Sequence, residues 1–180
     1  MIKRAIMAAA LALAACDNGG GVMREIERAE KADADAAQEM AANADEFLAG
    51  VRAQAGIEAR PSGLLIERRA RGRNQSLPRP SENAAVLVHY EGRLPNGEVF
   101  DSSFARNEPA QFPLAQVVPG FAEAIQQMRP GDEVIATFPM ELGYGPEGRP
   151  PAIPPASPLQ FRIVLLAFQE PGGRIVEAPR

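Results

Sequence analysis

The chain has 180 residues, of which 46% are hydrophobic and 23% are charged, and this composition suits one modest globular domain with additional segments. Its formal net charge of −4 disfavours nucleic acid as a partner, and its single cysteine excludes an intrachain disulfide. With one histidine and one cysteine, the chain lacks the usual ligands of a zinc site, so we expect no metal.

The first residues have the pattern of an export signal. The basic start MIKR is followed by the apolar run AIMAAALALAA at 5–15, which is shorter than the ~20 residues that a membrane-spanning helix needs. The stretch LAAC at 13–16 resembles a bacterial lipobox, in which cleavage leaves the cysteine as the lipidated first residue. The alternative is ordinary cleavage after ALA, with an incidental cysteine. We expect a signal peptide at 1–15, lipidation of Cys16 that includes palmitate, and a flexible tether at 16–21.

A lipid on Cys16 would place the protein in the bacterial cell envelope, facing the periplasm, with the membrane as one partner. Several acyl chains anchor a protein stably where a single chain does not. Asp17 resembles the inner-membrane retention signal of some Gram-negative lipoproteins, so the inner membrane is favoured over the outer.

The segment 22–59 is expected to be an N-terminal helical segment. Residues 22–55 contain no proline, and their apolar side chains recur at three- and four-residue intervals, as in an amphipathic helix. These side chains are Val22, Ile26, Ala29, Met40, Ala44, Phe47, Leu48 and Val51. Between 29 and 39 only alanine is apolar, which favours a solvated spacer over a dimerising helix, and thus a monomer or weak homodimer. Gly56 is a plausible end of the helix.

The main domain is expected at 60–168, followed by a loose tail at 169–180. β-branched and aromatic residues predict strands at 64–69, 84–94, 98–103, 132–140 and 159–168. Segment 120–132 has apolar residues at helical spacing and predicts one short helix, and 142–158 is a proline-rich loop. The pattern indicates an α+β domain in which a helix lies on one face of an antiparallel sheet.

Nucleophilic catalysis has few candidate residues. His89 is the only histidine, and alternation along its strand turns it to the face opposite Tyr90. We interpret Ser102 and Ser103 as turn residues and His89 as an ordinary strand residue. No phosphate-binding loop or dinucleotide-binding glycine motif is present, so no cofactor is expected. The remaining aromatic and aliphatic residues suit an apolar binding cleft.

Five blocks follow one another over residues 83–168: VHYEGRLPNGEVFDSS, VVPGFAEAIQQMRPGD, GYG, IPP and LQFRIVLL. In this order they resemble the FKBP-type peptidyl-prolyl cis/trans isomerases. The preceding FLAGVRAQAGIEARPSGLLIERRARG resembles the bacterial subgroup that includes the macrophage infectivity potentiator-like proteins. The resemblance implies a twisted antiparallel β-sheet wrapped around one short α-helix, with an apolar cleft between them. It also implies that the protein accelerates the rotation of X-Pro bonds in exported, proline-containing polypeptides.

The resemblance assigns residues to this cleft. It implies catalytic roles for Tyr90, Asp101 and Tyr144, with Asp101 held by Tyr90 near the twisting carbonyl group and the Tyr144 hydroxyl on a substrate carbonyl. The substrate-binding residues that it implies are Phe100, Phe112, Val117, Val118, Phe121, Ile153 and Phe161. Phe121 would form the floor, and the backbone N–H of Ile153 would donate to a substrate carbonyl.

Several positions depart from the family pattern. Phe121 stands where many members have tryptophan, and Arg149 where a histidine is common. Ala110 and Ala152 replace larger side chains, which widens one wall. Macrolide inhibitors are further ligands that the resemblance implies, and these departures bear on their affinity.

An apolar cleft can act on a prolyl bond without a nucleophile. Water stabilises the polarised carbonyl of the planar imide, whereas the twisted imide has less charge separation, so a pocket that excludes water favours the twisted form. The alternative is a chaperone-like peptide-binding module on the same fold with little isomerase activity. A structural envelope lipoprotein, with these aromatics as plain core and Asp101 as a turn cap, is the third interpretation.

Overall fold

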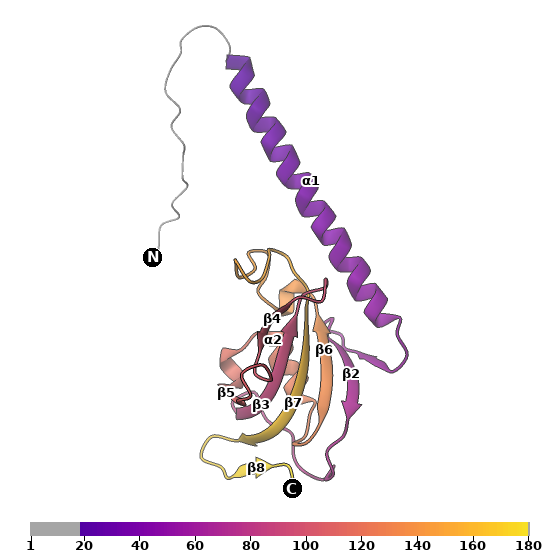
Figure 1. Ribbon diagram of the computed structural model, residues 1–180, viewed down its shortest axis with the longest axis vertical. Helices are drawn as coiled ribbons and strands as arrows, with labels where there is room; N and C mark the ends of the chain where they lie inside the picture. The colour runs from indigo at the N-terminus through magenta and orange to yellow at the C-terminus, as the bar shows by residue number, and fades with distance from the viewer. Residues whose placement is uncertain (1–18, 180) are drawn as a thin grey trace. The chain divides into compact units, whose positions relative to one another are not determined.

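The computed structural model describes residues 19–179 (Figure 1). The chain divides into two compact units, Met1–Ala37 and Gln38–Arg180. The predicted signal peptide, Cys16 and Asp17 lie outside the described residues. Among the residues described, no helix is both long and apolar enough to cross a membrane.

Helix α1, Gly19–Arg52, begins within the segment predicted as a tether, of which residues 19–21 are helical. Its C-terminal end differs from the predicted helical segment, because the chain leaves the helix at Arg52. Gly56 then adopts a φ of +84°, a left-handed conformation that glycine tolerates. Ile57–Ala59 form strand β1 instead of helix, since their backbone groups pair with the strand that follows.

One sheet of eight strands forms the main domain, and every pairing in it is antiparallel. The strands after β1 are β2 (Leu65–Ala70), β3 (Ala85–Arg93), β4 (Val99–Ser102), β5 (Ala110–Pro113), β6 (Glu133–Phe138), β7 (Leu159–Gln169) and β8 (Ile175–Glu177). Their order is β1-β2-β6-β7-β3-β4, with β5 paired to β3 and β8 to β7. The predicted α+β class and antiparallel sheet are confirmed. The tail is not loose throughout, because β8 pairs with β7.

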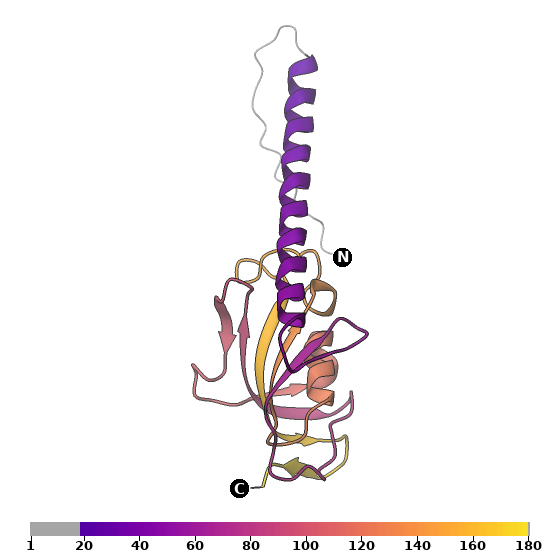
Figure 2. The same ribbon diagram turned by 90° about the vertical axis from the view of Figure 1, so that its right-hand side faces the viewer.

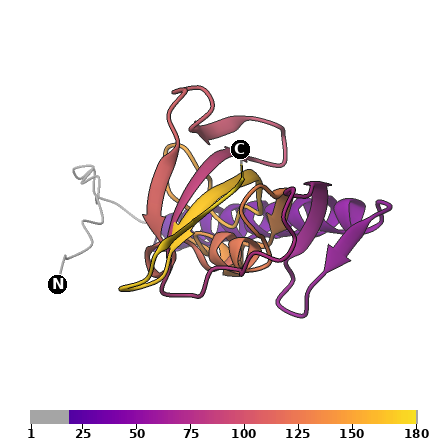
Figure 3. The same cartoon turned by 90° about the horizontal axis from the view of Figure 1, so that it is seen from below.

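Helix α2, Pro119–Gln126, lies against β6 and β7 on one face of the sheet (Figures 2 and 3). Pro119 suits the first helical turn, where its missing N–H is not needed. The helix is shorter than the predicted 120–132. Its approach to β6 is close, because a Cβ on Gly120 would lie 2.5 Å from the ring of Phe138. This glycine sets the helix, and with it Phe121, directly on the sheet. Two short 3₁₀ helices, Leu114–Gln116 and Met140–Leu142, precede α2 and follow β6.

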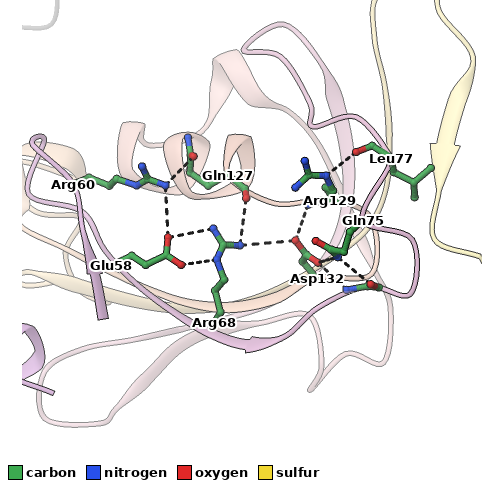
Figure 4. Close-up of polar contacts among 9 residues, drawn as sticks. Glu58, Arg60, Arg68, Gln75, Leu77, Gln127, Arg129 and Asp132 are labelled. Carbon is green, nitrogen blue, oxygen red and sulfur yellow. Dashed lines mark hydrogen bonds and ion pairs between the residues drawn. The ribbon is translucent and has the colours of Figure 1, made fainter. Parts of the chain in front are cut away.

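A polar network holds the C-terminal end of α2 (Figure 4). Arg68 on β2 donates to the carbonyl of Gln127 at 3.4 Å and to Glu58 at 2.7 Å. Asp132 is 1% exposed, and its carboxylate accepts the N–H of Arg129 at 2.9 Å and that of Gly72 at 2.7 Å. The network therefore ties the helix end to β1, β2 and the 72–77 connection.

The core lies between α2 and the sheet. Its fully buried side chains include Leu64, Ile66, Val86, Val88, Ala124, Ile125, Met128, Ala136, Phe138, Leu159, Ile163 and Leu165. Partly buried aromatic and aliphatic residues pack against this core. They include the predicted cleft residues Phe100, Phe112, Val117, Val118 and Tyr144.

Candidate active site

A cavity of about 280 Å³ opens beside the N-terminal end of α2. It is lined by Tyr90, Phe100, Asp101, Phe112, Gln116, Val117, Val118, Phe121, Tyr144, Arg149 and Phe161. All of the predicted cleft residues except Ile153 are in this set. The sheet supplies the back of the cavity, the segment entering α2 supplies one wall, and the 143–153 loop supplies another.

Phe121 forms the floor. It is 4% exposed in the first turn of α2, and its ring packs edge-on against Phe161 and Tyr90, with centroid distances of 5.2 Å and 5.9 Å. Phe100 meets Phe161 edge-on at 5.5 Å, and Phe112 meets Tyr90 at 5.7 Å. Edge-to-face contacts of this kind fix ring orientation as well as burying area. The result is a rigid apolar surface made from β3, β4, β5, β7 and α2.

A polar corner closes one end of this apolar surface. The Tyr90 hydroxyl donates a hydrogen bond to the Asp101 carboxylate. The guanidinium of Arg106 donates to Asp101 at 2.6 Å and to the Tyr90 oxygen at 3.2 Å. The same guanidinium lies 5.9 Å from the centroid of the Tyr90 ring. Asp101 therefore lines the cavity with a carboxylate that is already paired with the Arg106 cation.

The pKa values of this corner follow from burial and these bonds. Burial raises the pKa of the Tyr90 hydroxyl, and its bond to Asp101 raises it further. Burial alone would raise the pKa of Asp101, but the hydrogen bonds from Tyr90 and Arg106 outweigh it and hold that pKa below its usual value. Near neutral pH the corner therefore holds a carboxylate, a phenol and a guanidinium cation.

The two serines of the DSS motif have structural roles. Ser103 is fully buried; its Oγ accepts the backbone N–H of Tyr90 at 2.8 Å and donates to the Tyr90 carbonyl at 3.2 Å. Ser102 Oγ accepts the N–H of Ala105 at 3.2 Å. His89 contacts Ser103 Oγ at 3.1 Å and stacks on Phe104, with ring centroids 4.9 Å apart. Ser103 lies in the turn as predicted, whereas Ser102 is the last residue of β4. The serine that contacts the histidine also fixes the backbone of Tyr90.

The 143–153 loop carries Tyr144 and Arg149. The guanidinium carbon of Arg149 lies 5.8 Å from the centroid of the Tyr144 ring, within the range of a cation–π contact. Ile153 differs from the prediction. Its side chain is 3% exposed, and its N–H donates to the carbonyl of Arg149 at 3.1 Å, while the Arg149 N–H donates back to Ile153 at 2.8 Å. The N–H expected to bind a substrate carbonyl is already used to close the loop.

Three residues of the site did not follow from the motifs as site residues. Gln116 and Arg149 line the cavity, and Arg106 completes the polar corner. Arg106 lies in the loop between β4 and β5, where no sequence periodicity reports on contacts. Its position five residues after Asp101, in a loop that must return to β5, is the only signal that could have suggested it. In the part of the chain that the structure describes, no group of three His, Cys, Asp or Glu side chains could hold a metal ion.

The chain is similar to known proteins over most of this domain. A family model described as FKBP-type peptidyl-prolyl cis-trans isomerase matches residues 78–166. The chain is 40% identical over 145 residues to the FKBP-type 22 kDa peptidyl-prolyl cis-trans isomerase of Escherichia coli, in an alignment that covers 80% of this chain and 69% of that protein. It is 42% identical over 118 residues to the macrophage infectivity potentiator of Trypanosoma cruzi, covering 65% of this chain and 59% of that relative. The chain therefore spans less than two thirds of this second relative.

Solved structures have the same fold. A crystal structure of a peptidyl-prolyl cis-trans isomerase from Pseudomonas syringae superposes with a TM-score of 0.67 at 34% identity, covering 73% of this chain and 94% of that one. The crystal structure of FkpA from Escherichia coli also has a TM-score of 0.67, at 29% identity, and covers 88% of this chain and 71% of that one. The sheet, the short helix and the cleft between them belong to this fold.

Proposed function

Because the chain belongs to the FKBP-type peptidyl-prolyl cis-trans isomerases, we propose that the cavity over Phe121 is where it rotates X-Pro bonds, and that its substrates are exported polypeptides. One observation carries the choice of site: six aromatic rings and two valines converge on one cavity, with a single carboxylate in its lining. Of the described residues, no serine, threonine, cysteine, lysine or histidine lines this cavity, so its lining offers none of the usual activated nucleophiles or their general base.

The chemistry needs only a selective environment. Rotation about a peptide C–N bond has a barrier of about 18–20 kcal/mol, because the amide resonance must be lost. The rings of Phe121, Phe161 and Phe100 would hold the proline where water is excluded, which disfavours the polarised planar imide relative to the twisted one. The bond then rotates without any covalent intermediate.

The polar corner would act on the imide carbonyl. Asp101 is held by Tyr90 and Arg106, so its carboxylate keeps one orientation while the substrate turns. Tyr144, on the 143–153 loop, also lines the cavity, and its hydroxyl would bind a carbonyl of the substrate. Fixed groups of this kind need no reorganisation during the reaction.

A pair of matched substitutions tests the site. Phe121→Leu and Phe168→Leu each replace a phenylalanine that is at most 4% exposed, but only Phe121 lines the cavity. In a protease-coupled assay on X-Pro peptides, we expect kcat/KM per folded molecule to fall in the Phe121 variant and to stay unchanged in the Phe168 variant. Equal effects in both variants would move the reaction out of this cavity.

We also propose that Cys16 carries the lipid anchor, on the strength of the LAAC stretch and the short apolar run before it. The domain would then face the periplasm, with Asp17 favouring the inner membrane. Wild type should sediment with membranes and incorporate an alkyne-labelled palmitate, and Cys16→Ser should do neither. Continued membrane binding of Cys16→Ser would contradict the anchor.

Two finer proposals concern ligands and assembly. Macrolide inhibitors would enter the same cavity, but Ala110 offers them less wall than an aromatic residue would, so we expect weak inhibition. The protein would be a monomer or weak homodimer, because the middle of α1, residues 29–39, carries only alanine as apolar content. Isomerase assays with and without a macrolide test the inhibition. Sedimentation velocity at several protein concentrations tests the oligomeric state.

A further inference from the structure

Arg149 is a cation at the cavity that has no carboxylate partner among the residues the structure describes. Its guanidinium lies by the face of the Tyr144 ring, 5.8 Å from the centroid. The other charged group of the lining, Asp101, pairs with a different arginine, Arg106, at 2.6 Å. A cation–π contact supplies no oxygen acceptor, so N–H donors of the guanidinium stay available to a carboxylate.

The electrostatic balance of the cavity is therefore positive. Asp101 and Arg149 are the two charged residues of the lining, and Asp101 is already bonded to Arg106 and Tyr90. Arg106 and Arg149 are positive and Asp101 is negative, so the three residues carry one net positive charge. Because Asp101 pairs with Arg106, the unpaired positive charge among these three is that of Arg149. A substrate that brings a carboxylate to this side of the cavity would supply the missing partner.

The backbone that carries Arg149 is fixed. Arg149 and Ile153 exchange two backbone hydrogen bonds, at 2.8 Å and 3.1 Å. Gly148, just before it, has a φ of +62°, and a Cβ there would lie 2.3 Å from the carbonyl oxygen of Pro154. A cation on a closed loop loses less conformational freedom on binding than one on a free loop, which favours its use in selecting a ligand.

We propose that Arg149 makes the cleft prefer substrates that carry aspartate or glutamate next to the proline. This inference rests on the proposed isomerase function, because the flanking residue reaches Arg149 only when the proline occupies the cavity over Phe121. A bidentate pairing of guanidinium with carboxylate is the geometry that such a residue would form. Neutral residues of the same shape would lack this contact, and lysine would be repelled.

The size of the effect is limited by exposure. Arg149 is exposed at the mouth of the cavity, and ion pairs in such positions change an equilibrium by about 1.5- to 5-fold. We expect a preference of that order for glutamate over glutamine. It should fall as salt is raised, because exposed charges are screened over roughly 10 Å at 0.1 M salt.

The experiment measures kcat/KM of the full chain on peptide pairs that differ in one residue. Glu-Pro is compared with Gln-Pro and Lys-Pro, and Pro-Glu with Pro-Gln and Pro-Lys, at low and high salt. The proteins are wild type, Arg149→Gln, Arg149→Glu and the control Arg174→Gln. Arg174 lies in the turn between β7 and β8, at the end of the sheet opposite the 143–153 loop (Figure 1). Arg174→Gln therefore makes the same change in net charge as Arg149→Gln, but far from the cavity.

The expected result is a glutamate preference at one or both flanks in wild type and Arg174→Gln. It should disappear in Arg149→Gln and become a lysine preference in Arg149→Glu. A Glu-to-Gln ratio that is the same in all four proteins, with isomerisation of the Gln-Pro peptide intact, would overturn this inference alone. No isomerisation of any peptide, including the neutral ones, would instead overturn the proposed function.

Discussion

Replacing Ser103 by alanine separates a structural serine from a catalytic one. Ser103 Oγ accepts the N–H of Tyr90 at 2.8 Å and is fully buried. Alanine leaves that N–H without this acceptor in a place water does not reach, and an unsatisfied buried donor costs about 1–3 kcal/mol. We expect the free energy of unfolding to fall by about this amount, and the thermal midpoint to fall by several degrees.

Urea unfolding gives the magnitude, since a stability change shifts the midpoint and leaves the slope unchanged. Ser76→Ala is the control, because Ser76 is exposed and substitutions at such positions usually change stability by at most about 0.5 kcal/mol. The isomerisation rate per folded molecule of Ser103→Ala should stay within a few-fold of wild type. Loss of nearly all activity with unchanged stability would contradict the structural role and indicate that Ser103 takes part in catalysis.

Three further predictions concern the packing of α2, the polar network at its end and the polar corner of the cavity. Gly120→Ala should destabilise the domain by about 1–3 kcal/mol, measured by urea unfolding, because its Cβ would overlap the ring of Phe138; a neutral result would mean that α2 can move off the sheet at no cost. Asp132→Ala should cost about 3 kcal/mol in the same assay, because the N–H groups of Gly72 and Arg129 lose the buried carboxylate that accepts from them; a cost below 1 kcal/mol would contradict the network in Figure 4. The pKa of Asp101 is lower in the folded state than in the unfolded state, so its ionised carboxylate stabilises the fold. This contribution is fully present above the pKa of the unfolded state and is lost as the pH falls through the pKa of the folded state. Arg106→Gln should raise the folded pKa of Asp101, so carboxyl titration by NMR should move to higher pH, and an unmoved titration would remove Arg106 from the corner.

The strands could be predicted because they follow local patterns, whereas the cleft residues were assigned by the resemblance to the FKBP-type family. Alternation along β3 places Val86, Val88 and Tyr90 in the core, each at most 6% exposed. Helical spacing likewise places Phe121 and Ile125 on the buried side of α2. These patterns give the buried faces, and the family motifs then supply the remaining cleft residues.

Other features depend on contacts that no local pattern reports. Ile57–Ala59 and Ile175–Glu177 are too short to show alternation, and they become strands only because β2 and β7 offer free edges. Arg106 joins the site through the path of a loop. The N–H of Ile153 was expected to be free for substrate, but it pairs with Arg149, four residues earlier, once the loop closes.

Exchange NMR on an X-Pro peptide with a catalytic amount of the protein tests the central claim most directly, because it observes cis and trans populations at equilibrium without a coupling protease. We predict exchange cross-peaks that build up on a timescale of seconds or faster, against tens to hundreds of seconds for the uncatalysed bond. Peptide resonances should broaden at the proline, and protein resonances of Phe121 and Tyr90 should shift. Binding at the same residues with exchange at the uncatalysed rate would contradict the account and leave a peptide-binding module on this fold.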